Sequence, residues 1–316
     1  MTWLCDKIVR EFPNITAKYE IGRSYQGNPI YAIEMTNEAS ENRAKKGVLV
    51  NGGHHARELT SYTMVMYLML KTAYGYYNNH TEAFDILNST VLYFVPAVNV
   101  DGFKYISEVY GSTGHLKYIR KNRNDGKVDG YSPCLEDEYL GVDLNRNYDF
   151  KFADDNVGSN PNPCAEDYRG PYPFSEPETR AIRDFLQTHQ DLVMAFNFHA
   201  YGNLLIYPFN YEPSAINSHL HSQFPVQEQV YNEIARETSL PEGNLQGNAM
   251  QAIQYEANGE ASDWMLGSHS IVAMSPELGI QDQRSDDFFV EDPEILKAIV
   301  VQNEAWVFRA IAKVQP

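Results

Sequence analysis

Short apolar segments typical of β-strands alternate along this chain with longer segments of helical periodicity. Strands are predicted over residues 30–35, 47–51, 91–98, 192–198, 204–207 and 271–274. Helices are predicted over residues 4–12, 59–74, 226–237 and 293–314. The second helix is too uniformly apolar to be exposed, so it should pack on the sheet and end near Gly75. This order predicts an α/β fold with a mixed, mostly parallel twisted central sheet flanked by helices.

The length and composition favour one compact unit. The 316 residues are 43% hydrophobic and 21% charged, close to ordinary globular usage, and no repeat or low-complexity linker divides them. We therefore expect a single domain over residues 1–316, and a monomer. The formal net charge of −17 excludes binding to nucleic acid through a broad basic face. No apolar run reaches the ~18 residues of a membrane span.

The three cysteines allow two arrangements. Cys134 and Cys164 flank a segment rich in Pro, Asn and Gly, whereas Cys5 lies alone near the N-terminus. One disulfide plus one spare thiol is the simplest arrangement, and three reduced thiols are the alternative.

Three N-glycosylation acceptor patterns begin at Asn14, Asn79 and Asn88. Together they favour a secreted or extracellular glycoprotein, and a lysosomal or vacuolar location is the alternative. The first five residues carry no signal-peptide pattern, so a targeting segment is expected to be missing from this sequence.

Polar clusters follow several of the predicted strands, where ligands of such sheets tend to bind. The first lies at residues 52–58 (GGHHARE), directly after the strand that ends at residue 51. His55 and Glu58 are three residues apart and can turn towards one point, as two zinc ligands would. His54 has the same spacing to Arg57, which cannot ligate a metal, so His54 is interpreted as a structural neighbour. A His-x-x-Glu pair alone is common by chance.

A third ligand is predicted at His199, which ends the apolar strand 192–198, while six of the other histidines lie in polar or loop-like surroundings. The alternative is a core or edge histidine whose nitrogens are satisfied by the backbone. Two histidines and one glutamate leave the fourth tetrahedral position open for water, the pattern of a catalytic zinc site. This ligand set predicts a hydrolase.

A hydrolase of this kind needs a general base, and Glu58 cannot serve if it is a ligand. Glu277 follows the strand 271–274 and lies between Pro276 and Gly279, so we expect it in a constrained turn beside the metal. The alternative is an exposed loop acid.

At these residues the chain resembles the carboxypeptidase A family of zinc peptidases, over nearly its whole length. His55 to Glu58 match the family's His-x-x-Glu, and residues 141–147 (GVDLNRN) match its Gly-Val-Asp-x-Asn-Arg-Asn. The other matching segments are residues 199–201, 204–208 and 255–264, and Glu277 at the catalytic glutamate. Residues 21–27 resemble the opening of the peptidase domain, so no activation domain is expected in this sequence.

The resemblance implies a role for each matching residue. Arg146 and Asn145 would bind the terminal carboxylate of a peptide, because a guanidinium fork and an amide are suitable donors. Arg120 would stabilise the oxyanion of the transition state. Tyr255 would be the mobile tyrosine that closes over substrate, and Asp143 would fix the tautomer of His55.

Two further residues, Arg57 and Tyr201, are expected to contact the substrate. The implied activity is removal of single amino acids from peptide and protein C-termini with one Zn²⁺ ion, and the implied partners include a protein inhibitor or a propeptide. The same scaffold supports amidases of cell-wall peptides and enzymes that trim glutamate, but Asn145 and Arg146 favour ordinary peptides. An inactive peptide-binding pseudopeptidase would have lost a ligand or the base, and none is missing.

The choice of C-terminal residue depends on a stretch that departs from the family pattern. Ser262 stands where digestive members carry an aliphatic residue or an aspartate, and we expect it at the floor of the side-chain pocket. Glu260 on the wall would attract Lys or Arg, while Met250 would still accept apolar side chains, giving broad specificity. Alternatively, Glu260 points to solvent and the pocket is neutral. Residues 125–139 and 154–163 are expected to be lengthened loops around this site.

Overall fold

An eight-stranded mixed sheet forms the centre of the computed structural model, which describes residues 2–39, 45–126, 132–214, 216–237, 246–279 and 288–313. Its strand order is β1-β2-β4-β3-β5-β8-β6-β7. The strands are β1 (Thr16–Arg23), β2 (Pro29–Met35), β3 (Lys46–Gly52), β4 (Thr90–Val95), β5 (Leu192–Ala200), β6 (Leu204–Ile206), β7 (Gln246–Gly247) and β8 (Val272–Leu278). The four central strands β4, β3, β5 and β8 are parallel to one another. The β1–β2, β2–β4 and β6–β8 pairs are antiparallel, and the short β7 pairs parallel with β6. The predicted α/β fold with a mixed sheet is confirmed.

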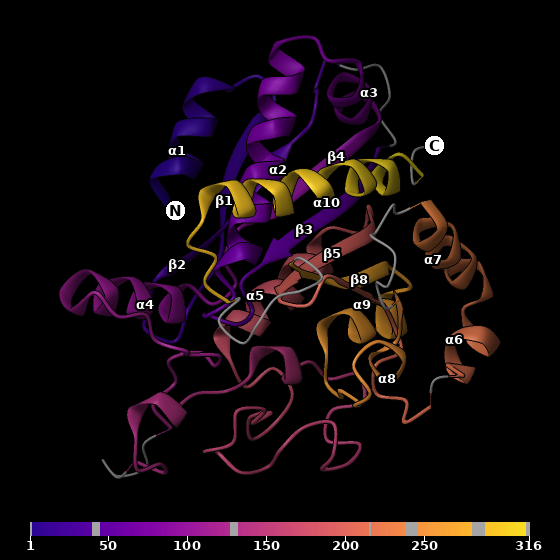
Figure 1. Ribbon diagram of the computed structural model, residues 1–316. Coiled ribbons are helices and arrows are strands. Elements are labelled where there is room, and N and C mark those ends of the chain that lie inside the picture. Colours follow the sequence, from indigo (N-terminus) through magenta and orange to yellow (C-terminus); the bar gives the residue numbers. More distant parts are fainter. Residues whose placement is uncertain are drawn as a thin grey trace.

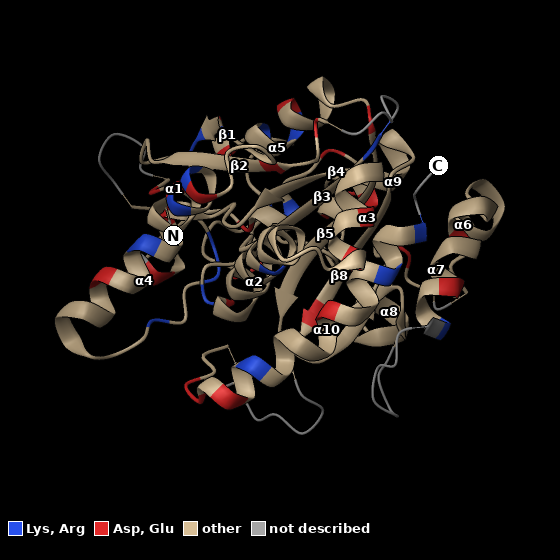
Figure 2. Ribbon diagram, turned by 90° about the horizontal axis from the view of Figure 1, so that it is seen from above, with Lys and Arg blue, Asp and Glu red and all other residues tan. Residues whose placement is uncertain are grey.

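Helices cover both faces of this sheet (Figures 1 and 2). The longer ones are α1 (Thr2–Glu11), α2 (Leu59–Tyr77), α3 (Thr81–Ser89), α4 (Val100–Thr113), α5 (Pro177–Thr188), α7 (Pro225–Glu237), α9 (Ala261–His269) and α10 (Pro293–Lys313). Two short ones are α6 (Ser218–Gln223) and α8 (Ala249–Ala252), and a 3₁₀ turn, η2, spans Leu144–Arg146. No described helix is long and apolar enough to cross a membrane.

Successive side chains of the central strands pack into two separate apolar cores, one on each face of the sheet. Val48 and Val50 of β3 join one core with α2 and α10, and Leu49 between them joins the other with α5 and α9. This alternation is the two-residue period of a strand, and both faces of the parallel strands are buried. In the view from above, α5 and α9 lie on one side of the sheet and α2 and α10 on the other (Figure 2).

Several boundaries differ from the sequence predictions for local reasons. The strand predicted over 91–98 ends at Val95, before Pro96, and Asn99 then caps α4 by accepting a hydrogen bond from the Gly102 amide. The helix predicted to end near Gly75 continues to Tyr77. A Cβ at Gly75 would lie 2.9 Å from the Ala83 side chain, so this glycine permits close packing of α2 on α3.

The strand predicted over 271–274 is longer and continues through Pro276 to Leu278. The edge strand β1 was not predicted, because its side chains are half-buried or exposed and carry little apolar signal. Val314, the last residue of the predicted C-terminal helix, lies outside the described residues, as do residues 127–131 of the predicted loop 125–139.

The cysteine prediction is confirmed. Cys134 and Cys164 form a disulfide with their Cα atoms 5.5 Å apart, and Cys5 is a buried free thiol in α1. The loops that this disulfide joins lie beside the carboxyl ends of the parallel strands, around Arg120 and Lys121.

Candidate active site

The loop between β3 and α2 carries the first two candidate ligands. Gly53 begins this loop with a φ of +69°, and a Cβ there would lie 2.3 Å from the Tyr62 ring. Only glycine therefore fits this turn without displacing α2. The turn brings His55 and Glu58 over the carboxyl end of β3, where His199 projects from the neighbouring strand β5.

Three buried side chains converge at this point. His55 Nδ1 lies 2.6 Å from Glu58 Oε1, and His199 Nδ1 lies 2.9 Å from Glu58 Oε2 and 3.2 Å from His55 Nδ1. Of the described residues, these form the one group of three whose ligand atoms lie within 4.8 Å of one another. The structure thus brings together the three residues that the sequence predicts as ligands.

This donor set suits zinc. Two imidazole nitrogens and a carboxylate are its usual ligands in catalytic sites. His55 Nε2 lies 3.0 Å from Asp143 Oδ1, the carboxylate contact that orients a metal-binding histidine. Although burial raises the pKa of Glu58, the charges of His55 and His199 hold it below its ordinary value, so this carboxylate is anionic. His55, Glu58 and His199 would hold the ion.

Arg120 and Asp143 form a second layer beside these ligands. Arg120 Nε donates to Asp143 Oδ2 at 2.8 Å, and Arg120 Nη1 lies 3.8 Å from Glu58 Oε1. Burial favours the neutral acid at Asp143, but the charges of Arg120 and His55 hold its pKa well below the usual range. Asp143 therefore fixes both a histidine and the candidate oxyanion-binding arginine.

Glu277 faces the same hollow from β8. It pairs in register with His199 of the adjacent strand, so the two side chains emerge together at the sheet edge. Glu277 does not lie in the constrained turn expected from its sequence. It lies within the strand, and Gly279 follows the strand's end. Burial, together with the charge of Glu58, raises the pKa of Glu277 above its ordinary value.

The 3₁₀ turn η2 positions Asn145 and Arg146. The Asp143 carboxylate accepts a hydrogen bond from the Asn145 amide and so caps the turn. Arg146 donates from Nε to the Gly158 carbonyl at 3.0 Å and from Nη1 to the Asn145 carbonyl at 2.7 Å. These backbone contacts fix the guanidinium, while no described residue accepts a hydrogen bond from its Nη2.

Most of these groups line one small hollow of about 50 Å³, and Glu58 and Asp143 lie behind them in contact with His55. Its lining residues are His55, Arg120, Asn145, Arg146, His199, Ile206, Asn210, Ala249, Ile253, Tyr255, Ala257, Glu260, Ser275 and Glu277. The hollow therefore combines the candidate metal ligands with two arginines and an apolar wall.

Comparisons with known proteins match this arrangement. A family model described as zinc carboxypeptidase matches residues 1–305. The chain belongs to the zinc carboxypeptidase family. It is 30% identical to carboxypeptidase A6 of Mus musculus over 268 residues, which are 84% of this chain and 56% of that protein. It is 28% identical to carboxypeptidase B2 of Bos taurus over 267 residues, 84% of this chain and 57% of that protein.

The chain spans little more than half the length of these relatives. Solved structures share its fold. The crystal structure of thrombin activatable fibrinolysis inhibitor has a TM-score of 0.80 at 24% identity, covering 99% of this chain and 72% of that one. Carboxypeptidase A from Helicoverpa armigera has a TM-score of 0.75 at 24% identity, covering 98% and 72%. The family resemblance predicted from the motifs is confirmed.

Glu260 lines the hollow and is only 3% exposed, so it does not point to bulk solvent. Ser262 Oγ and Ser275 Oγ donate to it at 2.5 and 2.6 Å, and the amides of Ser262 and Asp263 also donate to it. Burial alone would raise its pKa, but these hydrogen bonds hold the pKa of Glu260 below its ordinary value. The pocket thus has an anionic end.

Two pocket predictions need correction. Ser262 is fully buried behind Glu260, to which it donates, and does not line the hollow. Met250 does not line it either, because the preceding helical position, Ala249, faces the hollow. Sequence reasoning missed Asn210 and Ser275. Both are brought to Glu260 by long-range pairing, and neither lies in a local motif that would mark it.

Arg57 and Tyr201 do not line the hollow, and both contact Phe288. Arg57 Nη1 donates to Glu166 at 2.9 Å, and its guanidinium lies 4.4 Å from the centre of the Phe288 ring. Tyr201 packs edge-on against the same ring, with centroids 4.8 Å apart. Phe288, which joins these two side chains, could not be identified from the sequence. Tyr255, at the mouth, is 52% exposed.

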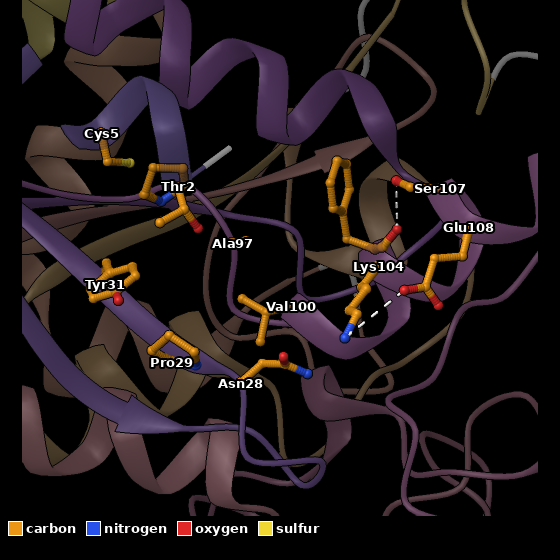
Figure 3. A pocket seen from close by; sticks show the side chains of 12 residues that line it. Thr2, Cys5, Asn28, Pro29, Tyr31, Ala97, Val100, Lys104, Ser107 and Glu108 are labelled. Atoms are coloured by element: carbon orange, nitrogen blue, oxygen red, sulfur yellow. Dashed lines mark hydrogen bonds and ion pairs between the residues drawn. The ribbon is translucent and has the colours of Figure 1, made fainter. Parts of the chain in front are cut away.

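A larger cavity of about 390 Å³ lies on another part of the surface, between α1, β2 and α4 (Figure 3). Thr2 and Cys5 approach it from α1, Tyr31 from β2, and Lys104 and Glu108 from α4, where they form an ion pair at 3.9 Å. None of the predicted site residues lines it. The chemistry of the lining, rather than the size of the cavity, therefore identifies the candidate active site.

Proposed function

We propose that the protein is a metallocarboxypeptidase that hydrolyses the C-terminal peptide bond of peptides and proteins and releases single amino acids. The observation that carries this proposal is the placing of Arg146 and Asn145 in the same small hollow as the His55, Glu58 and His199 group. An arginine fork beside a hydrolytic site accepts a free carboxylate, which restricts cleavage to chain ends.

Each side chain has one task in this reaction. Arg146 and Asn145 bind the terminal carboxylate and so position the last peptide bond near the candidate metal ligands. Glu277 takes a proton from the attacking water and passes it to the departing amine, a role that its raised pKa supports. Arg120 faces the developing oxyanion. His55, Glu58 and His199 would hold a single zinc ion, whose Lewis acidity would lower the pKa of water and polarise the carbonyl group.

The pocket supports broad specificity for basic and hydrophobic C-terminal residues. Ile206, Ile253 and Ala257 give an apolar wall, and the anionic Glu260 at its end would pair with a lysine or arginine head group. The same charge disfavours a released glutamate, so trimming of glutamate is the weaker alternative. The complete set of ligands, base and carboxylate-binding side chains argues against a pseudopeptidase.

Secretion is proposed on other grounds. The Cys134–Cys164 disulfide is typical of an oxidising compartment, and the acceptor sequences at Asn14 and Asn79 suit a secreted or lysosomal glycoprotein.

A monomer of one catalytic domain is proposed. A solved relative, bovine thrombin-activatable fibrinolysis inhibitor, is in complex with tick carboxypeptidase inhibitor. A protein inhibitor or a propeptide that covers the same hollow is therefore proposed as a partner here.

A panel of N-blocked dipeptides that differ only in the C-terminal residue tests this function. Free amino acid should be released from those ending in Phe, Leu, Lys or Arg, and chelator should abolish the release. The matched dipeptide amides, which lack the terminal carboxylate, should be resistant because Arg146 has no partner. Equal cleavage of acids and amides would rule out carboxypeptidase action, whereas cleavage only of cell-wall peptides would favour the amidase alternative.

A further inference from the structure

The three glycosylation acceptor sequences lie in very different surroundings. Asn14 is exposed in the turn between α1 and β1, and Asn79 is exposed in the turn between α2 and α3 with a φ of +57°. Asn88, in contrast, is half-buried at the end of α3, where its Oδ1 accepts a hydrogen bond from Asn37 at 2.7 Å. The threonine of that third acceptor, Thr90, is fully buried in β4. Only the first two acceptors are exposed.

Each of the two exposed acceptors has an aromatic residue two positions before its asparagine. Phe12 precedes Asn14 and Tyr77 precedes Asn79, whereas the buried Ile86 holds this position before Asn88. A hydrogen-bonded turn follows each aromatic residue and contains its acceptor asparagine. Thr16 Oγ1 donates to the Phe12 carbonyl at 2.7 Å, and the Asn79 amide donates to the Tyr76 carbonyl at 3.0 Å.

The two aromatic residues belong to one cluster, which we call the aromatic cluster: Phe12, Tyr74 and Tyr77. The ring centre of Phe12 lies 4.9 Å from that of Tyr74 and 6.1 Å from that of Tyr77. Tyr77 is 72% exposed and Tyr74 is 43% exposed, whereas Phe12 is 8% exposed, so the two tyrosine rings are the surface that a sugar can contact. The C-terminal ends of α1 and α2 reach the same end of the molecule, so both acceptors flank this cluster (Figure 1).

We infer that Asn14 and Asn79 carry N-linked glycans whose first N-acetylglucosamine stacks on the aromatic cluster, and that Asn88 is unmodified. The face of an aromatic ring is electronegative and attracts the polarised C–H groups of a sugar ring, while stacking removes exposed aromatic surface from water. The inference rests on the proposed secretory route.

The modification is a group transfer from a lipid-linked diphosphate oligosaccharide in that pathway. The asparagine Nδ2 forms a bond to C1 of the first sugar and loses one proton to a base of the transferase. The bond between C1 and the diphosphate oxygen breaks, and the lipid diphosphate leaves with the electron pair. A chain so modified at Asn88 would have to fold around a sugar beside the Asn37 contact and the buried Thr90.

Site occupancy is tested by producing the whole chain through the secretory pathway of a eukaryotic cell. Peptide-N-glycosidase in ¹⁸O water converts each glycosylated asparagine to a labelled aspartate, which mass spectrometry maps. Label is expected at Asn14 and Asn79 and not at Asn88. Unlabelled Asn14 or Asn79, or label at Asn88, would overturn the assignment of sites.

Stacking is tested by removing the glycan in two steps. Trimming each glycan to its first N-acetylglucosamine should leave Tm unchanged, and removing that sugar should lower Tm by about 1–3 °C, from a stacking contact as strong as an aromatic pair. In Tyr77→Ser the second step should have a smaller effect. Tyr110→Ser, at another exposed ring (53%) in α4 away from any acceptor, should behave as wild type.

If removal of the first sugar lowers Tm equally in Tyr77→Ser and in wild type, stacking on the aromatic cluster is contradicted. Because the chain is directed into the pathway, the result does not depend on whether the natural protein is secreted. Release of amino acids from dipeptides is measured on the same samples. The peptidase proposal is therefore tested by this second measurement, whatever the result for the glycans.

Discussion

Three glutamates at the candidate site have different environments, and these support different proposed roles. Glu58 faces two histidines, and Glu260 accepts several hydrogen bonds, so both have lowered pKa values and remain anionic. Glu277 loses solvation and lies near the charge of Glu58, so its pKa is raised. When neighbouring carboxyl groups have different pKa values, those with a lowered pKa stay anionic and can bind a cation, and the one with a raised pKa can carry a proton.

Replacing Glu277 by Gln tests the proton carrier. The side-chain size is kept, so fold and metal content should be retained, while kcat for a blocked dipeptide should fall by at least about a hundredfold, the lower range for a lost general base. Steady-state kinetics with metal analysis of the same sample would measure this. Near-normal turnover would mean that another residue accepts the proton.

Replacing Glu260 by Gln tests substrate choice. The variant should lower kcat/KM for C-terminal Lys and Arg by roughly tenfold or more and leave Phe and Leu substrates nearly unchanged, because a desolvated ion pair is lost. Ser262→Ala is the matched control, since it removes a donor to Glu260 but keeps the charge, and it should retain cleavage of basic residues. If wild type ignores basic C-termini, Glu260 does not select substrate.

At the scale of elements, the site is the shared edge of three parallel strands. His55 follows β3, His199 ends β5 and Glu277 lies near the end of β8, and these strands are neighbours in this order. That is why apolar strands followed by polar residues were sufficient to locate the candidate ligands in the sequence. The same reasoning could not find Asn210 or Phe288, which reach the site through loops whose paths the local pattern does not encode.

Strand β8 shows a second limit of the sequence analysis. Pro276 suggested a turn, but its missing amide is accommodated within the sheet, since pairing with β5 skips residues 275 and 276 and resumes at His199 and Glu277. Ser262 is a third residue whose position could not be predicted from the sequence. Its offset from Tyr255 suggested the pocket floor, whereas the first turn of α9 directs Ser262 behind the Glu260 cap.

The Cys134–Cys164 disulfide clamps loops that hold Lys121, whose Nζ donates to the carbonyls of Tyr139, Pro163 and Ala165. Replacing both cysteines by Ser should lower the free energy of unfolding by about 3–4 kcal/mol, because a cross-link closing 30 residues restricts the unfolded chain. Denaturant unfolding with and without reductant measures this. Reductant should not change the free energy of unfolding of the double variant. If reductant also leaves that of the wild type unchanged, the expected stabilisation is contradicted.

A pH effect is expected where α5 meets the β1–β2 turn. Glu178 is fully buried in the first turn of α5 and accepts hydrogen bonds from the Tyr25 amide and from Asn122. Burial raises its pKa to about 7. The folded state therefore binds more protons than the unfolded state between about pH 4.5 and 7, and stability should fall as pH rises through this window, by about 3 kcal/mol in total.

Glu178→Gln isolates this contribution, because a neutral side chain cannot titrate. Thermal unfolding of wild type and variant from pH 4.5 to 8 should show the wild type losing stability relative to the variant as pH rises. A stability difference that stays constant over this range would show that Glu178 is not the titrating group.

On the scale of the whole molecule, the candidate metal centre joins segments far apart in sequence. His55 and Glu58 belong to the β3–α2 connection and His199 to β5, so the three ligand atoms come together only when the central sheet has formed. An ion that binds this arrangement and not the unfolded chain stabilises the fold by mass action. The same ion is required for the proposed hydrolysis, so activity and stability should depend on zinc together.

Removing the metal should therefore lower Tm and abolish release of amino acids, and zinc should restore both. At a free zinc concentration about 1,000 times Kd the added stability is about 4 kcal/mol. Glu277→Gln should show the full zinc-dependent rise in Tm without recovering activity, because the ligands are intact and the base is lost. His199→Ala should lose the rise in Tm as well, since one ligand is missing. Undiminished hydrolysis by a verified metal-free sample, or an unchanged Tm response in His199→Ala, would exclude this metal centre.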